Sequence, residues 1–153
     1  MKSSLALTAL LGCLVGTDAD LRSTIYAAVV ARSGLQSNCS AFSSLFTPGG
    51  QYESPVGSGG VVGPAAIARE CEAFNSLIGV DGSGWYPGPF FSSSNRSAFT
   101  LQIRTVGVGG CKVDLNGIVS IHYDTAADKL SSWQHHYDAV WDDVTLHGKC
   151  TAM

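Results

Sequence analysis

The sequence predicts a single α+β domain in which helices come first and an antiparallel sheet follows. In the first half of the chain, apolar residues recur at the spacing of a helix with one buried face. From residue 99 onward they alternate with polar residues, as in a half-buried strand. Helices followed by strands favour an α+β order over repeated β-α-β units. At 153 residues, of which 45% are apolar and 14% charged, the chain can form one domain with a substantial core.

Three helices are expected before residue 80. The first covers residues 20–32, the second starts at a cap on Asn38 or Ser40, and the third begins at Pro64 and ends at Gly79. Each has one face of regularly spaced core residues. These are Leu21, Ile25, Ala28, Val29 and Arg32 in the first helix, Phe42, Leu45 and Phe46 in the second, and Ile67, Cys71, Phe74 and Leu77 in the third.

Glycine and proline mark the segments between these elements. The second helix is expected to stop at the turn of residues 47–50, and residues 51–54 form a short extended piece. The glycine-rich residues 56–63 are predicted to be a loop, which we interpret as a rim over a pocket. Residues 81–94 carry two prolines, and we expect a long loop there that holds at most a short strand. The segment also contains an aromatic cluster of Trp85, Tyr86, Phe90 and Phe91.

The second half of the chain is predicted to be an antiparallel meander. Residues 99–105 and 111–124 are expected to pair through a two-residue turn at Gly109-Gly110, with a bulge or bend at Asn116-Gly117. After a turn, a last strand runs from residue 130 to about residue 141.

The N-terminal segment has the pattern of an export signal. Lys2 is followed by an apolar run over residues 5–16, and Thr17-Asp18-Ala19 leaves small residues for cleavage. A run of this length spans only about 18 Å as a helix, too short for a hydrocarbon core of about 30 Å. The sequence therefore predicts a signal peptide at residues 1–19, a mature domain at residues 20–146 and a secreted protein with no membrane attachment after signal removal.

Four cysteines remain after signal removal. They are Cys39, Cys71, Cys111 and Cys150, and none of them forms a C-x-x-C pair. An even number of such cysteines in an exported domain predicts two disulfides, with the three connectivities left open. The tail of residues 147–153 would then be held by Cys150.

Two Asn-x-Ser triplets point to the same secretory route. Asn38 is followed by Cys39, a poor context for an acceptor, whereas Asn95 follows a serine run in an expected loop. Both are candidate glycosylation sites, and Asn95 is the better one.

The charge of the chain excludes several partners. Its formal net charge of −3 leaves no basic face for nucleic acid or anionic lipid. Residues 57–60 resemble a phosphate loop but lack its Gly-Lys-Ser/Thr ending, and no cofactor is expected. No metal site is expected either, because His135 and His136 are adjacent on a strand and point to opposite faces. His122 could pair with His136 across the outer face, where a solvated polar surface is the default interpretation and a surface metal the alternative.

Two segments resemble the nuclear-transport-factor-2-like superfamily, in its SnoaL-like and ketosteroid isomerase branch. They are LFTPGGQYESPVGSGGVVGPAAIARECEAFNSL, residues 45–77, and KLSSWQHHYD, residues 129–138. The resemblance covers most of residues 20–143. It implies a cone in which three helices pack on a strongly curved antiparallel sheet and enclose a pocket for a small apolar molecule. Members often dimerise through the outer sheet face.

The resemblance also implies that the catalytic groups of ketosteroid isomerases are missing. Ser54 stands where their catalytic base lies, and the adjacent Glu53 points to the opposite face of its strand. Val119 falls where their protonated aspartate would bind the oxyanion. Tyr26 is the counterpart of their first-helix tyrosine. Since a neutral serine cannot accept a proton from a carbon acid unaided, isomerisation by this route is not expected.

His135 is the remaining candidate for chemistry. It stands where the epoxide-hydrolase branch carries a carboxylate, two residues after Trp133. Strand alternation places Trp133, His135 and Tyr137 on one face, which the resemblance turns toward the pocket. A histidine there serves either as a general acid/base or as a hydrogen-bonded wall residue.

The leading hypothesis is a secreted protein that binds a small hydrophobic molecule, with Ser54 and His135 as orienting polar groups. The predicted apolar wall comprises Tyr26, Tyr52, Phe74, Phe99, Ile103, Val119, Ile121, Tyr123, Trp133 and Tyr137. The alternative is a cofactor-free isomerase, cyclase or lyase acting on a polyketide- or terpenoid-like substrate. His135 would be its general acid/base, and Tyr26 or Ser54 would donate a hydrogen bond to an oxyanion. A third hypothesis is an interaction module that forms a homodimer through the outer sheet face.

Overall fold

The computed structural model describes residues 21–32, 38–54, 56–107 and 112–137. Residues 21–32 form the first helix, and two further helices and six strands follow. These elements are α2 (Cys39–Ser44), β1 (Phe46–Glu53), β2 (Val61–Val62), α3 (Pro64–Leu77), β3 (Ile78–Ser93), β4 (Arg96–Gly107), β5 (Lys112–Asp124) and β6 (Lys129–Tyr137). The predicted α+β class with three helices is confirmed.

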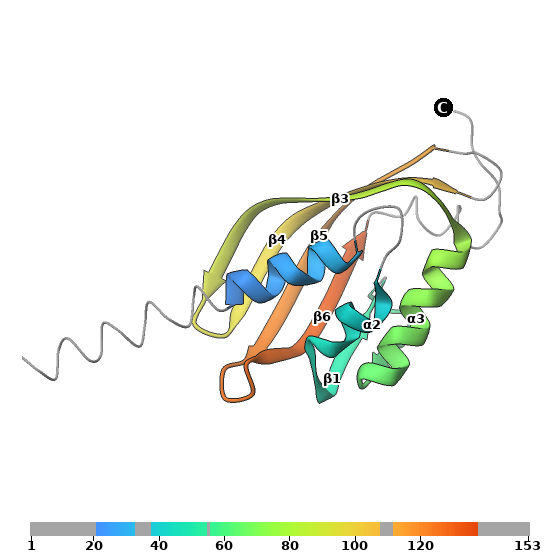
Figure 1. Cartoon of the computed structure of the whole chain (residues 1–153). Coiled ribbons are helices and arrows are strands. Elements are labelled where there is room, and N and C mark those ends of the chain that lie inside the picture. The colour runs from blue at the N-terminus through green and yellow to red at the C-terminus, as the bar shows by residue number, and fades with distance from the viewer. Residues whose placement is uncertain (1–20, 33–37, 55, 108–111, 138–153) are drawn as a thin grey trace, which may run out of the picture.

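The strands form one curved sheet that the helices cover (Figure 1). Its order is β2-β1-β6-β5-β4-β3, so β1 lies beside the last strand although β2, α3 and three further strands come between them in the chain. The β1–β6 pair is parallel and brings Tyr52 opposite Trp133. The other neighbouring strands pair antiparallel. This parallel pair places residues 52–54 next to residues 133–135.

The core lies between the sheet and the helices. The first helix buries Leu21, Ile25, Ala28 and Val29. From the sheet, alternate residues of β4 and β5 and two residues of β6 point into the same cluster. They are Phe99, Leu101 and Ile103 of β4, Val119, Ile121 and Tyr123 of β5, and Leu130 and Trp133 of β6. The inward set predicted for β5 is thus confirmed.

The helix predicted after Asn38 is shorter than expected. α2 begins at the Asn38 cap but ends at Ser44, and Phe46 already belongs to β1. The reason is tertiary: Phe46 pairs with Leu130, and the backbone N–H of Leu130 donates to the carbonyl of Leu45 at 2.8 Å. The turn sequence Thr-Pro-Gly-Gly therefore lies within β1, as an irregularity between the residues that pair with β6 at Phe46 and from Gln51 onward.

The segment expected to be a long loop is strand β3. Its residues pair with β4 from Ile78 to Ser93, with register shifts between Gly79 and Gly84 and between Pro87 and Phe90. β3 is the edge strand of the sheet. Proline is tolerated on an edge strand because no further strand needs its missing N–H. The expectation of a loop was wrong.

Two expectations for β5 and its turns have different outcomes. The register between β4 and β5 runs without a shift through Asn116 and Gly117, so the expected bulge at this position is absent from that pairing. The turn at residues 125–128 is confirmed and places Asp128 at a φ of 54°. The Gly109-Gly110 turn lies outside the described residues, as does the segment beyond Tyr137.

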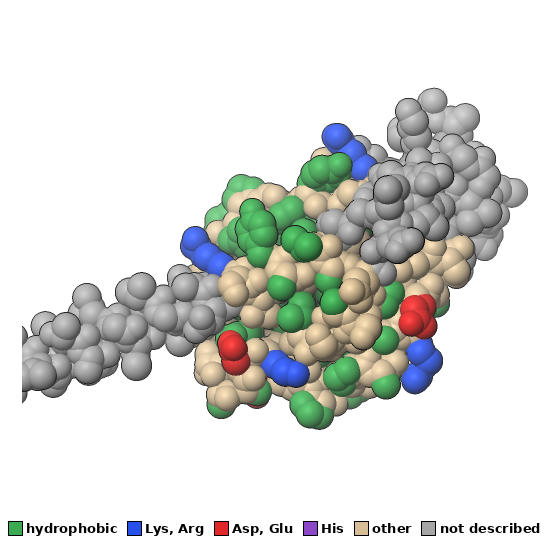
Figure 2. All heavy atoms as spheres, viewed as in Figure 1, with side chains coloured by type: hydrophobic (Ala, Val, Ile, Leu, Met, Phe, Trp, Pro, Cys, Tyr) green, Lys and Arg blue, Asp and Glu red, His purple; other side chains and the backbone are tan. Residues whose placement is uncertain are grey.

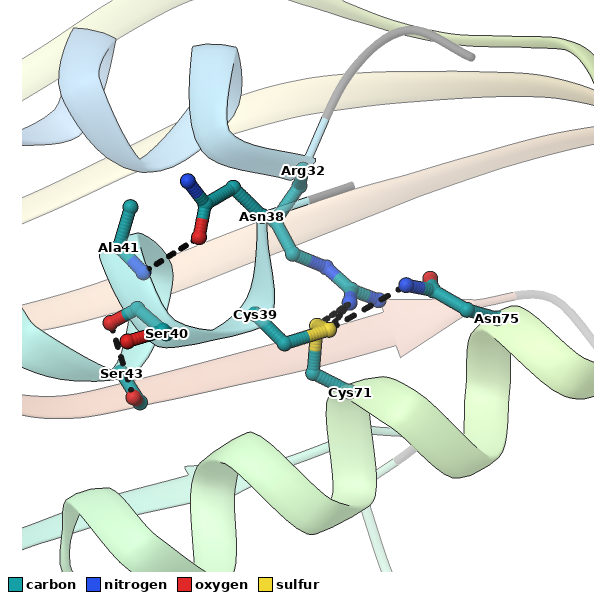
Figure 3. Close-up of a disulfide and its surroundings, with 8 residues drawn as sticks. All are labelled: Arg32, Asn38, Cys39, Ser40, Ala41, Ser43, Cys71 and Asn75. Atoms are coloured by element: carbon teal, nitrogen blue, oxygen red, sulfur yellow. Dashed lines mark hydrogen bonds between the residues drawn. A yellow bond between two sulfur atoms is a disulfide. The ribbon is translucent and has the colours of Figure 1, made fainter. Parts of the chain in front are cut away.

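A disulfide joins two of the helices. Cys39 of α2 and Cys71 of α3 are bonded, and their Cα atoms lie 5.5 Å apart (Figure 3). Cys111 and Cys150 lie outside the described residues, so the second disulfide stays a prediction, as do the signal peptide and the C-terminal tail.

None of the helices in the described part of the chain is both long and apolar enough to cross a membrane.

Candidate functional site: a buried histidine beside a serine

A histidine buried in the core is the centre of the candidate site. His135 is only 1% exposed. Its Nδ1 lies 2.9 Å from Oγ of Ser54, and Nε1–H of Trp133 donates to its Nε2 at 2.7 Å. The parallel β1–β6 pair brings Ser54 to it, and the two-residue repeat of β6 places Trp133 on the same face. Both ring nitrogens are thus engaged.

These contacts determine which nitrogen carries the proton. An indole N–H can only donate, so Nε2 of His135 must accept and carries no proton when the ring is neutral. The proton then lies on Nδ1, which donates to Ser54 Oγ. In this tautomer His135 cannot take a proton from Ser54, because the nitrogen that faces the serine is already protonated.

The surroundings of His135 keep it neutral. Its pKa is lowered well below the ordinary value of 6.5, first by burial, then by the positive charge of Arg32 and to a smaller degree by His136. The ring also contacts Trp85 and Tyr52, whose ring centroids lie 5.2 and 6.0 Å from its own. A low dielectric and a nearby cation both disfavour imidazolium.

Arg32 is a second polar residue buried beside this histidine. It is 2% exposed, and its guanidinium carbon lies 4.9 Å from the Trp85 ring centroid, 5.1 Å from that of Phe74 and 5.4 Å from that of Phe42. These are cation–π distances. Its Nη1 also donates to Sγ of Cys71, beside the Cys39–Cys71 disulfide (Figure 3). Arg32 therefore connects the first helix to α2, α3 and β3.

Arg32 was not predicted as a site residue, although a signal for it was present. It continues the buried stripe of the first helix at the same spacing as Leu21, Ile25 and Ala28. A charged residue on a buried stripe indicates a special environment, because arginine is rarely buried without partners. Trp85, which contacts both Arg32 and His135, was predicted only as part of an aromatic cluster.

A small hollow opens next to Ser54. It measures about 90 Å³ and is lined by Tyr52, Ser54, Ser58, Gly60, Val61 and Glu70. A larger hollow of about 270 Å³ shares Tyr52, Gly60 and Val61 with it. The residues common to both belong to β1, to β2 and to the loop of residues 56–60. The expectation that this loop lies at the rim of a pocket agrees with these linings.

Hydrogen bonds fasten the rim loop to the sheet. The N–H of Val56 donates to the carbonyl of His135 at 2.8 Å, and the N–H of Gly57 donates to Oε1 of Glu53 at 2.7 Å. The Gly57 bond is the main cause that lowers the pKa of Glu53, and the Gln134 side chain adds to it. Glu53 thus holds the loop from the outer face of the sheet, while Ser54 faces His135.

Most of the predicted wall residues are buried together. Tyr52, Phe99, Ile103, Val119, Ile121, Tyr123 and Trp133 are each at most 3% exposed. Several of the rings are in edge-to-face contact, as in the Phe99–Trp133 pair at 5.8 Å. Side chains therefore fill this described part of the interior, and the hollows described above lie beside it. Phe74 is partly buried and packs against the same cluster.

Two predicted wall residues do not join this cluster in the described structure. Tyr26 is 61% exposed, because the buried face of the first helix is formed by Leu21, Ile25 and Ala28. Figure 2 shows apolar side chains gathered over this helix, and Tyr26 and Val30 are exposed there. Tyr26 therefore lies on the outer face of its helix and does not contact His135 or Ser54. The side chain of Tyr137 lies outside the described residues.

The fold can be compared with that of known proteins. No protein-family model and no curated protein matches the chain. Among solved structures, a nuclear-transport-factor-2-like protein of unknown function from Burkholderia pseudomallei K96243 matches with a TM-score of 0.70 and 15% identity, covering 87% of this chain and 98% of its own. A protein from Jannaschia sp. CCS1, assigned as a SnoaL-like polyketide cyclase, matches with a TM-score of 0.70 and 9% identity. The match covers 86% of this chain and 94% of the Jannaschia chain.

The chain has the nuclear-transport-factor-2-like fold. TerC, co-crystallised with polyporic acid, shares it with a TM-score of 0.68 and 15% identity over 87% of this chain and 99% of its own. The resemblance noted in the sequence is thus confirmed at the level of the fold. At such identities the activity of a nuclear-transport-factor-2-like chain must be inferred from its own site residues.

Proposed function

We propose that the protein is secreted and binds a small, mainly apolar molecule beside Ser54, without proton transfer at His135. The observation that carries this proposal is the occupation of both nitrogens of His135. Its Nε2 lone pair accepts from Trp133 and its Nδ1 proton faces Ser54. The ring therefore holds these two side chains in position. A general base needs a free lone pair within reach of the proton that it abstracts.

The surroundings of Ser54 support binding. Ser54 and Tyr52 line the smaller hollow, and Tyr52 with Gly60 and Val61 also lines the larger one. In the smaller hollow the polar side chains of Ser54, Ser58 and Glu70 lie beside the rings and methyl groups of Tyr52 and Val61, so a ligand there would meet both hydrogen-bonding and apolar surface. A volume of about 90 Å³ holds only about three waters. We therefore expect a larger ligand to displace the loop of residues 56–60, which two backbone donors fasten.

The disulfide supports the export part of the proposal. Cys39 and Cys71 are bonded, and disulfides persist mainly in oxidising compartments. Together with the signal pattern of residues 1–19, this favours a protein that leaves the reducing cytosol.

Native mass spectrometry of the full chain from a eukaryotic secretory host tests the proposal. We expect the secreted protein to retain a small apolar adduct. Ser54→Ala should weaken binding of that compound by about two- to tenfold, because one hydrogen bond contributes about 0.5–1.5 kcal/mol. Ser76→Ala is the control, since Ser76 is exposed on α3 and its hydroxyl donates within its own helix. A secreted protein that is empty and also fails to bind the apolar dye 8-anilinonaphthalene-1-sulfonate would contradict the proposal.

The enzyme alternative is tested with the same secreted protein and the compound released from it. If the wild-type protein converts the released compound, His135→Ala should abolish the conversion and His136→Ala should leave it intact. His136 is the next residue of β6, points to the outer face and contacts Ser120. That result would assign catalysis to His135 and replace the binding proposal. The interaction module would be favoured by a dimer that holds no ligand and that dissociates in the variant Ile118→Lys. Ile118 is suited to this test because it is 52% exposed.

A further inference from the structure

A hydroxyl group near the β3–β4 turn has no function in the described fold. Ser97 of β4 is 5% exposed, and its Oγ makes no hydrogen bond within the described part of the chain. A buried hydroxyl without a partner destabilises the folded state, whereas alanine at the same position would leave nothing unpaired. A role outside the interactions of the folded chain would account for this hydroxyl.

Ser97 is the third residue of the triplet Asn95-Arg96-Ser97. In an Asn-x-Ser/Thr triplet the hydroxyl residue is part of the signal for attaching a glycan to the asparagine. The triplet requires the hydroxyl whether or not the folded structure uses it. A role in modification thus explains a serine that folding alone disfavours.

Asn95 is well placed for modification. Ser93 pairs with Arg96, so Ser94 and Asn95 form a two-residue turn at the tip of the β3–β4 hairpin. The backbone carbonyl of Asn95 accepts from the N–H of Tyr123 at 2.8 Å, which fixes the turn against β5. Asn95 is exposed, and within the described residues its side chain has no hydrogen-bond partner. A bulky group there displaces no interaction.

The surface beside Asn95 has room for sugars. A hollow of about 390 Å³ lies along this end of β3, β4 and β5 and includes Phe91, Arg96 and His122. Phe91 is 71% exposed. A bare aromatic ring with nearby hydrogen-bond donors suits the mixed apolar and hydroxyl surface of a sugar.

The second triplet, Asn38-Cys39-Ser40, is built differently. Oδ1 of Asn38 accepts from the N–H of Ala41 at 2.9 Å and caps α2, and Cys39 is in the disulfide (Figure 3). Its asparagine and its middle residue therefore both have structural functions.

We propose that Asn95, and not Asn38, carries an N-linked glycan. The co-reactant is a lipid-linked diphospho-oligosaccharide of the secretory pathway. Nδ2 of Asn95 forms a bond to the anomeric carbon, the bond from that carbon to the diphosphate oxygen breaks, the lipid diphosphate leaves, and one amide proton is lost to a base. The proposal rests on the export part of the proposed function, and Ser97 contributes only before the chain folds.

The first experiment maps the glycan. The full chain, with its own N-terminal segment, is expressed in a eukaryotic secretory host and analysed by intact mass and peptide mapping, before and after peptide-N-glycosidase. We expect one glycan, on Asn95. Asn95→Gln and Ser97→Ala should each abolish it, and Asn38→Gln should retain it. A secreted protein with unmodified Asn95 overturns this inference alone, whereas a chain that is neither secreted nor glycosylated overturns the export proposal as well.

The second experiment tests the argument about the hydroxyl. In the secreted Asn95→Gln background, which has no glycan at this site, adding Ser97→Ala should leave the Tm equal or higher. Adding Ser43→Ala is the matched control, because Ser43 is 6% exposed but its Oγ donates to the carbonyl of Ser40 at 3.1 Å. That change should lower the Tm. A Tm lowered as much by Ser97→Ala as by Ser43→Ala would show that the hydroxyl serves the fold and overturn the inference.

Discussion

At the scale of single residues, His135 is compatible with its surroundings only as a neutral ring. Protonation would place a hydrogen on Nε2, directly against the indole N–H of Trp133, and would bring a positive charge close to Arg32. The folded protein therefore resists protonation of this side chain, whereas the unfolded chain accepts a proton near the ordinary histidine pKa of about 6.5.

The stability of the protein should accordingly depend on pH through His135. Above a pH of about 6.5 the residue is neutral in both states and adds no pH dependence. Below it, the unfolded state binds a proton that the folded state does not, so the free energy of unfolding should fall as the pH is lowered toward the depressed folded pKa. The slope should be at most about 1.4 kcal/mol per pH unit for this proton. Urea unfolding between pH 5 and pH 8, a window of about one to two units on either side of that value, measures it.

Two variants identify the source of that slope. His135→Gln removes the titrating group and should remove its share of the slope. His136→Gln makes the same change one residue along β6 and removes only the smallest of the three causes that lower the pKa of His135, so it should keep most of the slope. An unchanged slope in His135→Gln would contradict the assignment of the pH dependence to His135.

The sequence predicted part of this geometry. Strand alternation correctly turned Trp133 and His135 inward and His136 outward, and the family resemblance placed Ser54 near them. The use of the Nε2 lone pair by Trp133 could not be foreseen, because alternation gives a face and not a rotamer. The exposure of Tyr26 could have been predicted, since the same helical spacing that buries Ile25 and Ala28 turns Tyr26 away from the core.

At the scale of elements, β3 shows why local propensity failed. Its glycines and prolines are poor strand formers, and nothing local predicts 16 residues of strand. Pairing with β4 along most of its length, together with a position at the sheet edge, overrides that propensity. By contrast α3 was predicted with its correct start, because Pro64 at the first turn and a regular apolar stripe are local signals.

The start of α3 depends on one glycine. Gly63 has a φ of +84°, and its carbonyl accepts from the N–H groups of Ala66 and Ile67. A Cβ there would lie 3.0 Å from the carbonyl oxygen of Pro48. Gly63→Ala should therefore destabilise the fold by about 1–3 kcal/mol, through both left-handed backbone strain and this contact.

Gly49 is the matched control for this prediction. A Cβ on Gly49 meets nothing within 4 Å, so Gly49→Ala should change the free energy of unfolding by less than about 0.5 kcal/mol. Urea unfolding of both variants compares them directly. Equal stabilities would mean that the junction between β2 and α3 relaxes without loss.

At the scale of the whole molecule, the helices are connected to one another as well as to the sheet. The first helix reaches α2 and α3 through Arg32, which stacks among Phe42, Phe74 and Trp85 and contacts Cys71. The disulfide joins α2 and α3 at the same point. A covalent bond and a buried cation thus meet above the central strands, close to His135.

This arrangement predicts a large contribution of the disulfide to stability. Cys39 and Cys71 are 32 residues apart, and closing such a loop removes chain entropy from the unfolded state worth about 3.5 kcal/mol. The double variant Cys39→Ala/Cys71→Ala should lose about 2–4 kcal/mol in urea unfolding. Because α2 is short and is held mainly by its contacts with α3 and β1, amide hydrogen exchange should rise first in α2. Unchanged exchange in α2, or a loss below about 1 kcal/mol, would mean that the packing around Arg32 suffices to hold these helices in place.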